Sequence, residues 1–478
     1  MISIPFALTY DDVLIVPRRS TLTSRQEAST KTQLTKRIEI NTPIITANMD
    51  TVTDATMAIA IARLGGIGIV HRFMSIEQHV EHIKKVKRAQ NQIVQSPYII
   101  HSDATVAEAE AYTAEVGITG LLVANGDNRL LGILSRRDFI FSENKNVLVR
   151  DIMTPRERLI VGDETTTFPI AKQLLLKHKI EKLPLVDAEN KIVGLITLDD
   201  MKHTIDYPNA SLDKEGQLLV GGAVGVHGDY IERAIALQAA GANVLVIDIA
   251  HGHSDNMFRA IKHIREAMPD IELIAGNIAT AQAAYDLCEA GADGLKVGVG
   301  PGSICITRLV TGCGMPQLSA VMNVASVAKK YGVPVIADGG IQRSGDIVKA
   351  IGAGADSVMI GSMFAGTTES PGGVIQKNDK KYKICRGSAS YTVSSDRKEI
   401  DQEKKKLKEI VPEGVESIVP FKGPIADIVQ QLLGGIRSGM SYVNARTIPE
   451  LKQNVTFVRL TSAGSRESGV HDVEALTS

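Results

Sequence analysis

The sequence lacks tryptophan altogether, and aromatic residues make up only 4% of its 478 residues. Its four cysteines form no CxxC pair and no Cys/His pairing, which argues against a disulfide framework and against a zinc site. No stretch approaches the roughly 20 consecutive apolar residues that a membrane-spanning helix needs. The first residues, MISIPFALTYDD, lack the basic and then apolar order of a signal peptide. We therefore expect a cytoplasmic protein that keeps its thiols reduced.

Neither sign of charge is in excess. Lysine and arginine number 53 against 54 aspartates and glutamates, so the net charge is −1 at pH 7. A balance this even argues against a nucleic-acid-binding surface, and we expect neither nucleic acid nor a membrane as partner. The hydrophobic content of 44% and the length predict an ordered chain of two or three domains.

Glycine, by contrast, is abundant, with 42 residues that gather where apolar runs end. From about residue 208 onward these runs alternate with amphipathic, helix-like segments, as in a parallel sheet buried on both faces. The runs span 218–226, 243–253, 271–280, 294–302, 333–341 and 357–366, and 43–52 and 65–72 look like two more. Eight such units, with polar residues at the strand ends, predict an α/β fold of the (β/α)8 TIM-barrel type. An open, doubly wound sheet is the rival arrangement.

A repeat interrupts this alternation. Residues 118–139 are matched by residues 180–201, which indicates a duplicated module. Three pairs share an offset of 62, namely Gly132 with Gly194, Ser135 with Thr197, and Asp138 with Asp200. A hydroxyl and a carboxylate three residues apart can cap a helix, and they can equally hold a ribose. The predicted domains are a barrel part at 1–91, an insert at 92–205 with repeats at about 95–148 and 152–204, and a second barrel part at 206–478.

The most glycine-rich turn, GVGPGSICITR at 298–308, follows an apolar strand and contains a cysteine. Gly298, Gly300 and Gly302 let several backbone N–H groups approach a ligand, as phosphate and cation cradles require. Two later strand ends, ADGGI at 337–341 and IGS at 360–362, add further glycine amides. Together these turns predict a phosphate site beyond the last barrel strands.

Cys305 lies within that turn. An intracellular cysteine is most often an ordinary buried thiol. Here, however, neighbouring backbone amides would stabilise a thiolate, which favours a nucleophile. Cys288 lies in a helical pattern, and neither Cys313 nor Cys385 shows a comparable setting, so we interpret these three as structural.

Eight segments then identify a resemblance that covers nearly the whole chain. They read TYDDVLIVP, ANMDTVT, VIDIAHGHS, AGNIAT, GVGPGSICITR, IADGGI, VPEGVESIVPFKGP and LGGIRSGMSY. In this order they resemble the IMP dehydrogenase/GMP reductase family, and the inserted repeat resembles that family's tandem CBS (Bateman) module. The resemblance implies a purine-nucleotide oxidoreductase, most like a GMP reductase that carries CBS modules.

The resemblance also implies roles for individual residues. Cys305 would form a covalent thioimidate with purine C2, while Thr307 and Glu413 would move protons near that carbon. Substrate would be held by Ser303, Asp338, Gly340, Gly361, Ser362, Arg386, Gly387 and Gly414. Asp248, Asn277 and Gly298 would face the nicotinamide cofactor. Carbonyls of Gly298, Gly300 and Cys305 would bind a monovalent cation such as K⁺, helped by a neighbouring subunit's tail like 466–472.

For the inserted module the resemblance implies regulatory purine nucleotides, such as ATP, GTP or GMP. The candidate residues are Ser135, Asp138, Thr197 and Asp200. It implies a homotetramer or an octamer as the assembly. The identity of the effector and the sign of its effect stay open.

Members of the family differ in a mobile flap, here at about 385–422. Dehydrogenases use an Arg-Tyr pair there to activate water, whereas ungapped alignment puts Asp401 and Gln402 at that position. Arg397 is followed by Lys398, and Tyr391 is the only tyrosine of 385–414. These residues favour an NADPH-dependent GMP reductase.

Two alternatives stay open. An NAD-dependent IMP dehydrogenase is the first, because the stretch GPIADIVQQLLGGIRSGM looks dehydrogenase-like, although Asn48 is more typical of reductases. A non-catalytic nucleotide sensor is the second, disfavoured because Cys305, Thr307 and Glu413 are all present. The sequence departs from the family pattern at two places, whichever enzyme it is. The usual RGM motif is replaced by RGSA at 386–389, and Cys385 stands where a phosphate-contacting tyrosine is expected.

Overall fold

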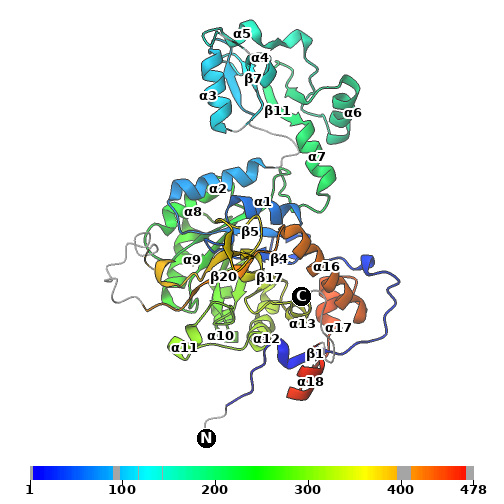
Figure 1. The fold of residues 1–478 in the computed structure, drawn as a ribbon, viewed down its shortest axis with the longest axis vertical. Coiled ribbons are helices and arrows are strands. Elements are labelled where there is room, and N and C mark those ends of the chain that lie inside the picture. The colour runs from blue at the N-terminus through cyan, green and yellow to red at the C-terminus, as the bar shows by residue number, and fades with distance from the viewer. Residues whose placement is uncertain are drawn as a thin grey trace. The chain divides into compact units, whose positions relative to one another are not determined.

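The computed structural model describes residues 4–89, 97–116, 118–140, 142, 144–393, 395 and 411–469 (Figure 1). The chain forms two compact units. One comprises Met1–Ala89, Asn209–Asp213 and Leu218–Ser478, and the other comprises Gln90–Pro208 and Lys214–Gln217. The second unit is therefore inserted into the sequence of the first.

The first unit is built on a closed barrel of eight parallel strands. In spatial order these are β12 (Val220–Val224), β13 (Val244–Asp248), β14 (Glu272–Ile278), β15 (Gly294–Val297), β16 (Val335–Asp338), β17 (Ser357–Ile360), β4 (Ile44–Thr46) and β5 (Ile67–Val70). Each lies within one of the apolar runs expected to form strands. The prediction of a TIM barrel is thus confirmed, and the open sheet is excluded.

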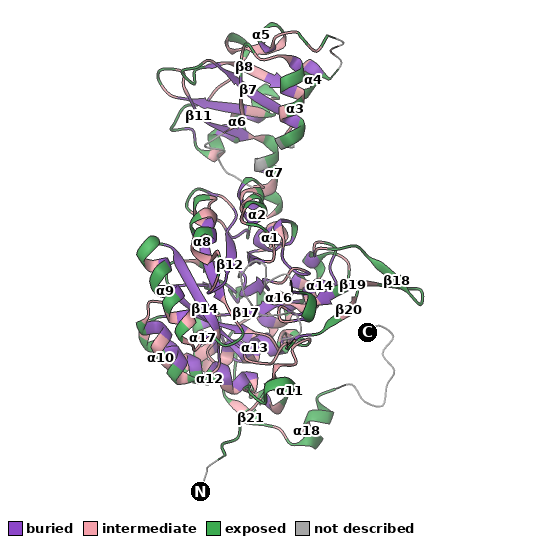
Figure 2. Ribbon diagram, turned by 90° about the vertical axis from the view of Figure 1, so that its left-hand side faces the viewer, coloured by how far each residue is buried: buried purple, intermediate pink, exposed green. Residues whose placement is uncertain are grey.

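Helices surround this barrel and bury one face each (Figures 1 and 2). They include α1 (Ala55–Arg63), α2 (Ile76–Arg88), α8 (Tyr230–Ala239), α9 (Asp255–Ala267), α10 (Ala281–Glu289), α12 (Gln317–Ala328), α13 (Ser344–Gly352), α16 (Ile425–Tyr442) and α17 (Ile448–Asn454). In α9 the buried residues Met257, Ala260, Ile261 and Ile264 recur at helical spacing, as expected for a helix packed on a sheet. The barrel strands are buried, apart from Asp248, Asn277 and Asp338, because helices cover the outside and side chains fill the inside.

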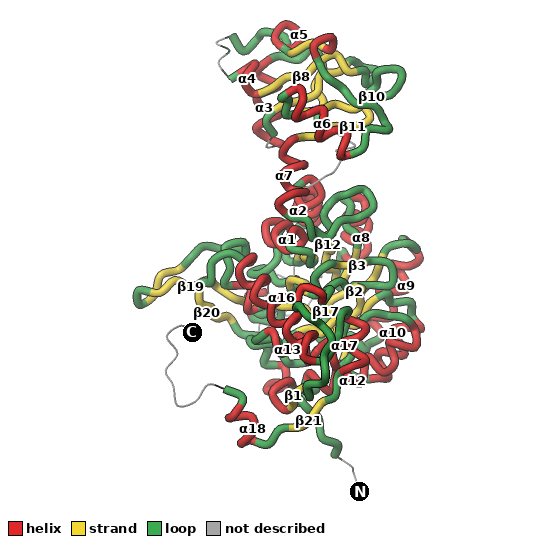
Figure 3. Tube along the Cα trace, turned by 90° about the vertical axis from the view of Figure 1, so that its right-hand side faces the viewer, coloured by secondary structure: helices red, strands yellow, loops and turns green. Residues whose placement is uncertain are grey.

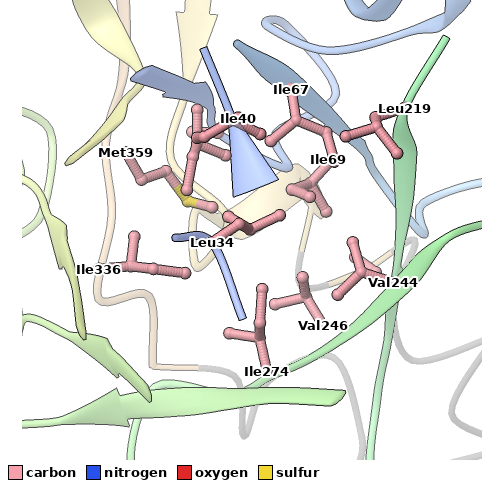
Figure 4. Packing of buried hydrophobic residues seen from close by; sticks show 13 residues of the cluster. Leu34, Ile40, Ile67, Ile69, Leu219, Val244, Val246, Ile274, Ile336 and Met359 are labelled. Carbon is pink, nitrogen blue, oxygen red and sulfur yellow. The ribbon is translucent and has the colours of Figure 1, made fainter. Parts of the chain in front are cut away.

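The interior of the barrel is closed at the end where the strands begin. Leu34 and Ile40, from the hairpin of β2 (Thr32–Gln33) and β3 (Glu39–Ile40), pack among the inward-facing strand residues (Figure 4). Arg37 of the same hairpin pairs with Glu272 at 2.5 Å, at the first residue of β14. The opposite end, where the strands end, is the usual active-site face of this fold.

The inserted unit contains two similar halves. The first comprises β6 (Ile99–His101), α3 (Val106–Val116), β7 (Gly120–Ala124), β8 (Leu130–Ser135), α4 (Arg136–Phe139), α5 (Val149–Ile152) and β9 (Thr154–Pro155). The second comprises α6 (Phe168–His178), β10 (Lys182–Val186), β11 (Ile192–Thr197) and α7 (Leu198–Asp206). The halves meet through reciprocal bonds, since Leu130 N donates to Asn190 O and Ile192 N donates to Asn128 O, both at 3.0 Å. Asn128 and Asn190 share a left-handed backbone and the offset of 62 found in the sequence.

The hydroxyl–carboxylate pair of the first half acts as a helix cap. The backbone N–H and the hydroxyl of Ser135 both donate to Asp138 Oδ2, at 2.6 and 2.7 Å, where α4 begins. In the second half Thr197 directly precedes α7, to which Asp200 belongs. The contact between Ser135 and Asp138 is explained by helix capping, so the ribose-binding role of these residues stays a prediction.

Besides the β2–β3 hairpin, the described part of the first unit has two further small sheets (Figure 3). One consists of β18 (Ile375–Lys377), β19 (Lys380–Arg386) and β20 (Glu416–Pro420), and the other pairs β1 (Val13–Ile15) with β21 (Phe457–Arg459). Arg397, Lys398, Asp401 and Gln402, on which the distinction between reductase and dehydrogenase depends, lie outside the described residues, as do residues 470–472 of the tail. Within the described ranges, no helix combines the length and the apolar character needed to cross a bilayer.

Candidate active site

A cavity of about 210 Å³ lies where the barrel strands end. Asp248 and Asp338 are the last residues of β13 and β16, and both line it. The turn that follows β15 supplies Gly298 to Gly302, Ile304, Cys305 and Thr307. Residues 387–389 and 413–414, which flank β19 and β20, contribute the remaining polar groups near the cysteine. Ala47 lines it too, so the cavity gathers segments that are more than 300 residues apart in the sequence.

The thiol of Cys305 is half-buried in this cavity and contacts the side chain of Thr307. It donates to the hydroxyl oxygen of Thr307 at 3.2 Å, just as the short helix α11 (Thr307–Thr311) begins. The N–H of Cys305 donates to Gly302 O at 3.1 Å, which fixes the turn before it. The thiol is therefore held at the mouth of a strand end, with a proton acceptor in contact.

Glu413 is held beside Cys305 by its own backbone. Ile306 N donates to Glu413 O at 2.8 Å, and Val415 N donates to Ile304 O at 3.0 Å. On the other side, the N–H groups of Glu413 and Gly414 both donate to Ala389 O at 3.0 Å. These bonds place three potential proton carriers in one cavity, namely a thiol, a hydroxyl and a carboxyl group.

Gly298 occupies a position that only glycine fits. Its φ is +154°, and a Cβ there would lie 2.1 Å from the carbonyl oxygen of Asp338. Any side chain would therefore push the 298–302 turn away from the end of β16. The turn that carries Cys305 and the strand end that carries Asp338 are consequently in close contact.

A buried lysine connects the polar groups on the cavity wall. Lys296 of β15, only 2% exposed, contacts Asp248 Oδ1 at 2.8 Å and Asp338 Oδ2 at 2.7 Å. Its third partner is the amide oxygen of Asn277. The Asn277 amide donates in turn to Gly298 O at 2.8 Å and to Asp338 Oδ2 at 2.9 Å, and Asn48 donates to Asp248 Oδ2 at 2.8 Å.

The charges in this network stabilise one another. Burial alone would raise the pKa of Asp248, but the charge of Lys296 and hydrogen bonds from Lys296 and Asn48 hold that pKa below its ordinary value. Burial alone would lower the pKa of Lys296, yet the two carboxylates hold it above its ordinary value. Asp248 therefore stays a carboxylate and Lys296 an ammonium at neutral pH.

The residues singled out from the sequence fall into two groups. Those that line the cavity are Cys305, Thr307, Glu413, Asp338, Gly387, Gly414, Asp248, Asn277, Gly298 and Gly300. Those outside its lining are Ser303, Gly340, Gly361, Ser362 and Arg386. Of these, Ser303 is exposed in the turn before Cys305, and Arg386 pairs with Asp50. Gly340 is the second residue after β16, and Gly361 and Ser362 directly follow β17.

Cys385 has no access to the cavity. It is fully buried on β19, and burial raises the pKa of its thiol to about 11. It therefore offers neither a thiolate nor an exposed group where the family resemblance led us to expect a phosphate-contacting phenol.

Lys296 and Gln317 were not singled out from the sequence. Gln317 donates to Val297 O at 2.8 Å and to Asp338 O at 3.0 Å, which ties α12 to two strand ends. For Lys296 a signal was present, because a lysine interrupts the otherwise apolar run GLKVGVG. A charge inside a buried strand needs partners, and this alone could have identified it.

The chain matches known proteins over nearly its whole length. Residues 7–471 match the family described as "IMP dehydrogenase / GMP reductase domain". The inosine-5'-monophosphate dehydrogenase of Nitrosopumilus maritimus is 50% identical over 470 residues, covering 98% of each chain. The GMP reductase of Leishmania donovani is 48% identical over 486 residues, covering 99% of this chain and 98% of its own.

A solved structure is similar over the whole fold. The GMP reductase of Trypanosoma brucei, solved as a cysteine-to-alanine variant in complex with guanosine 5'-monophosphate, superimposes with a TM-score of 0.91. It is 47% identical, and the match covers 99% of both chains. The prediction of the family from the sequence is confirmed, and the chain belongs to the IMP dehydrogenase / GMP reductase family.

Proposed function

We propose that the protein is an NADPH-dependent GMP reductase. It would convert GMP, NADPH and a proton into IMP, NADP⁺ and ammonia. One observation supports the covalent step that GMP reductases and IMP dehydrogenases share. The Cys305 thiol contacts Thr307, in a cavity that Glu413 also lines. The reductive direction is supported by the sequence, which has no Arg-Tyr pair within 385–414 to activate water.

The first half of the reaction would replace ammonia by sulfur. A bond forms between Cys305 Sγ and purine C2, the bond from C2 to the exocyclic nitrogen breaks, and the thiol proton leaves with ammonia. Thr307 accepts a hydrogen bond from the thiol at 3.2 Å and is placed to receive that proton. Glu413 is a suitable second carrier because its backbone is fixed beside Ile306.

The second half would release IMP. A reduced nicotinamide, when bound, supplies a hydride to C2, after which the C2–S bond breaks and Cys305 leaves as a thiolate. In an IMP dehydrogenase, by contrast, hydride leaves from C2 and water must then attack. The candidate residues of this chain can move protons around C2, but its sequence shows no arginine–tyrosine pair for that water.

The polar wall of the cavity fits a nicotinamide carboxamide. Each oxygen of Asp248 accepts one bond, from Lys296 or Asn48, and retains a lone pair for the carboxamide N–H₂. Asn277 has already donated both amide protons, to Gly298 and Asp338, so it would position these groups rather than donate to the cofactor. Gly298 would face the cofactor with its backbone, because the carbonyl oxygen of Asp338 occupies the space that a side chain would need.

The nucleotide would lie on the opposite side of Cys305. Asp338 would hold the ribose, and Gly387 and Gly414 would contact the base. Ser303, Gly340, Gly361, Ser362 and Arg386 would hold the phosphate and the remaining nucleotide groups from outside the present cavity lining. The carbonyls of Gly298, Gly300 and Cys305 would bind a monovalent cation such as K⁺.

We propose further that residues 92–205 form a regulatory tandem CBS module of a homotetramer or octamer. Its purine-nucleotide sites would involve Ser135, Asp138, Thr197 and Asp200. The two-half architecture with its reciprocal Asn128–Asn190 pairing supports a duplicated module. Titrating ATP, GTP and GMP into the full chain should shift its thermal unfolding or its kinetics saturably, and no response to any of them would contradict this role.

A paired assay tests the reaction. GMP with NADPH should lose reduced-nicotinamide absorbance, and IMP with NAD should show little change. The Cys305→Ala variant is the control and should be inactive in both. Rapid gain of absorbance with IMP and NAD would instead establish the dehydrogenase, which the 50% identity to the Nitrosopumilus enzyme keeps as the second candidate. Binding of purine nucleotides without either reaction would favour the nucleotide sensor.

A further inference from the structure

Lys296 differs from an ordinary buried ion pair in what it contacts. All three of its acceptors are side chains that line the cavity, Asp248, Asp338 and Asn277. An ammonium has three protons, so these contacts use its full donor capacity. The lysine side chain is only 2% exposed, but the three side chains that it bridges line the cavity, where a ligand could contact them.

The neighbouring strand is shaped to admit this side chain. Gly276 of β14 pairs directly with Lys296 of β15. A Cβ at residue 276 would lie 2.6 Å from Lys296 Cβ, closer than two side chains can approach. A glycine at this point in a strand interior weakens the strand, which indicates that the space it leaves is used.

The two carboxylates need a cation between them. Asp248 ends β13 and Asp338 ends β16, and both contact the same ammonium, so they face one another across Lys296. Asn48 donates to Asp248 and Asn277 donates to Asp338, but neither amide carries a charge, and the charge of Arg72 lowers the pKa of Asp248 less than that of Lys296 does. Without Lys296, two carboxylates would repel each other in a site that is largely shielded from water.

We propose that Lys296 is a positioning residue that holds Asp248 toward the nicotinamide cofactor and Asp338 toward the ribose of the purine nucleotide, and so links the two subsites. The inference rests on the proposed function, because the occupants of the two subsites come from it. Lys296 would touch neither purine C2 nor the hydride. It would act through the two carboxylates, one for each substrate.

The test is a set of steady-state measurements with Lys296→Met. We expect the KM for GMP and the KM for NADPH to rise together, each by about tenfold or more, because one buried cation supports both carboxylates. The value of kcat at saturation should change less, since binding rather than chemistry is lost. The matched control is Lys87→Met, which removes another buried, ion-paired lysine away from the cavity, and it should leave both KM values unchanged.

A double variant separates charge balance from simple loss of packing. Asp248→Asn should raise the KM for NADPH alone. Combining it with Lys296→Met removes one negative charge together with the positive one, so the KM for GMP should fall between those of the wild type and of Lys296→Met. If Lys296→Met does not fold, comparing Asp248→Asn with the double variant gives the same information, with a rise of about threefold or more expected in the KM for GMP.

Three results would overturn the inference. The first is a pair of KM values for Lys296→Met that match those of Lys87→Met, and the second is a loss confined to kcat. The third is a KM for GMP that stays unchanged when Lys296→Met is added to Asp248→Asn. Failure of the proposed function is seen separately, in the wild type. If the wild type oxidises IMP with NAD instead, the same comparison is made with those two substrates and the expected changes are the same.

Discussion

Two buried lysines occupy opposite ends of one barrel and have different partners. Lys296, where the strands end, contacts two carboxylates and an amide that all line the cavity. Lys87, at the end of α2, contacts Asp213, Asn243 Oδ1 at 2.9 Å and the carbonyl of Leu218 at 3.2 Å. None of these three partners lines the cavity.

The difference shows how one fold divides stability and chemistry between its ends. Asp213 and Leu218 flank residues 214–217, which belong to the inserted unit, so Lys87 joins barrel segments on both sides of an insertion point. Lys296 joins groups that a ligand can reach. In a TIM barrel, charges where the strands begin stabilise the fold, and charges where they end serve the site.

The largest effect on activity is expected in the cavity, where the barrel strands end. Cys305→Ala should lower turnover by about 10⁴-fold, because no other side chain in the cavity can form the bond to C2. Its thermal unfolding should stay close to that of the wild type, since the thiol is only half-buried. Residual activity above about a tenth of the wild-type rate would contradict the covalent scheme.

For Lys87, where the barrel strands begin, we expect the reverse: a loss of stability without a loss of activity. Lys87→Met should lower the free energy of unfolding by roughly 3 to 5 kcal/mol, because it removes the ammonium that contacts the Asp213 carboxylate, a side chain only 10% exposed. Below its unfolding temperature, kcat and both KM values should match the wild type. Denaturant unfolding combined with kinetics measures both, and a variant that keeps its stability but loses activity would reverse our assignment of the two ends.

A smaller effect is expected for Glu413→Gln, which preserves shape and removes the titratable proton. Turnover should fall by about 10²-fold, as is typical when a general acid is lost, with little change in the KM for GMP. Unfolding should be unaffected because the contacts that fix residue 413 are backbone bonds. A change in KM alone, with kcat intact, would reassign Glu413 to binding.

The smallest effect concerns the inserted unit. Ser135→Ala should cost about 1 kcal/mol or less of that unit's stability, because the hydroxyl bond to Asp138 is lost while the backbone N–H of residue 135 still donates to that carboxylate. Without nucleotides, the activity of the barrel should not change. Ser326→Ala, at an exposed position on α12, is the matched control. Unaltered stability of Ser135→Ala would show that the Ser135–Asp138 pair is not maintained as a cap.

Much of the barrel could be predicted from the sequence, because each strand is a continuous apolar run that ends in polar residues. Cys305 could be predicted too, since its glycine-rich turn is local. The hairpin plug at Leu34 and Ile40 could not, because it inserts from outside the alternating strands and helices. The Lys296 network could not be predicted in full either, since its acceptors come from three other strands, 19 to 48 residues away. Spacing along the chain does not encode such lateral contacts.

The central claim is that the sulfur of Cys305 displaces ammonia from C2 of GMP, and intact-protein mass spectrometry tests it most directly. The protein is incubated with GMP alone, quenched in acid and weighed beside Cys305→Ala treated in the same way. Our account predicts a wild-type adduct with the mass of GMP less ammonia, and none on the variant. Turnover of GMP with NADPH without any such adduct, or an adduct that persists after Cys305 is removed, would contradict it.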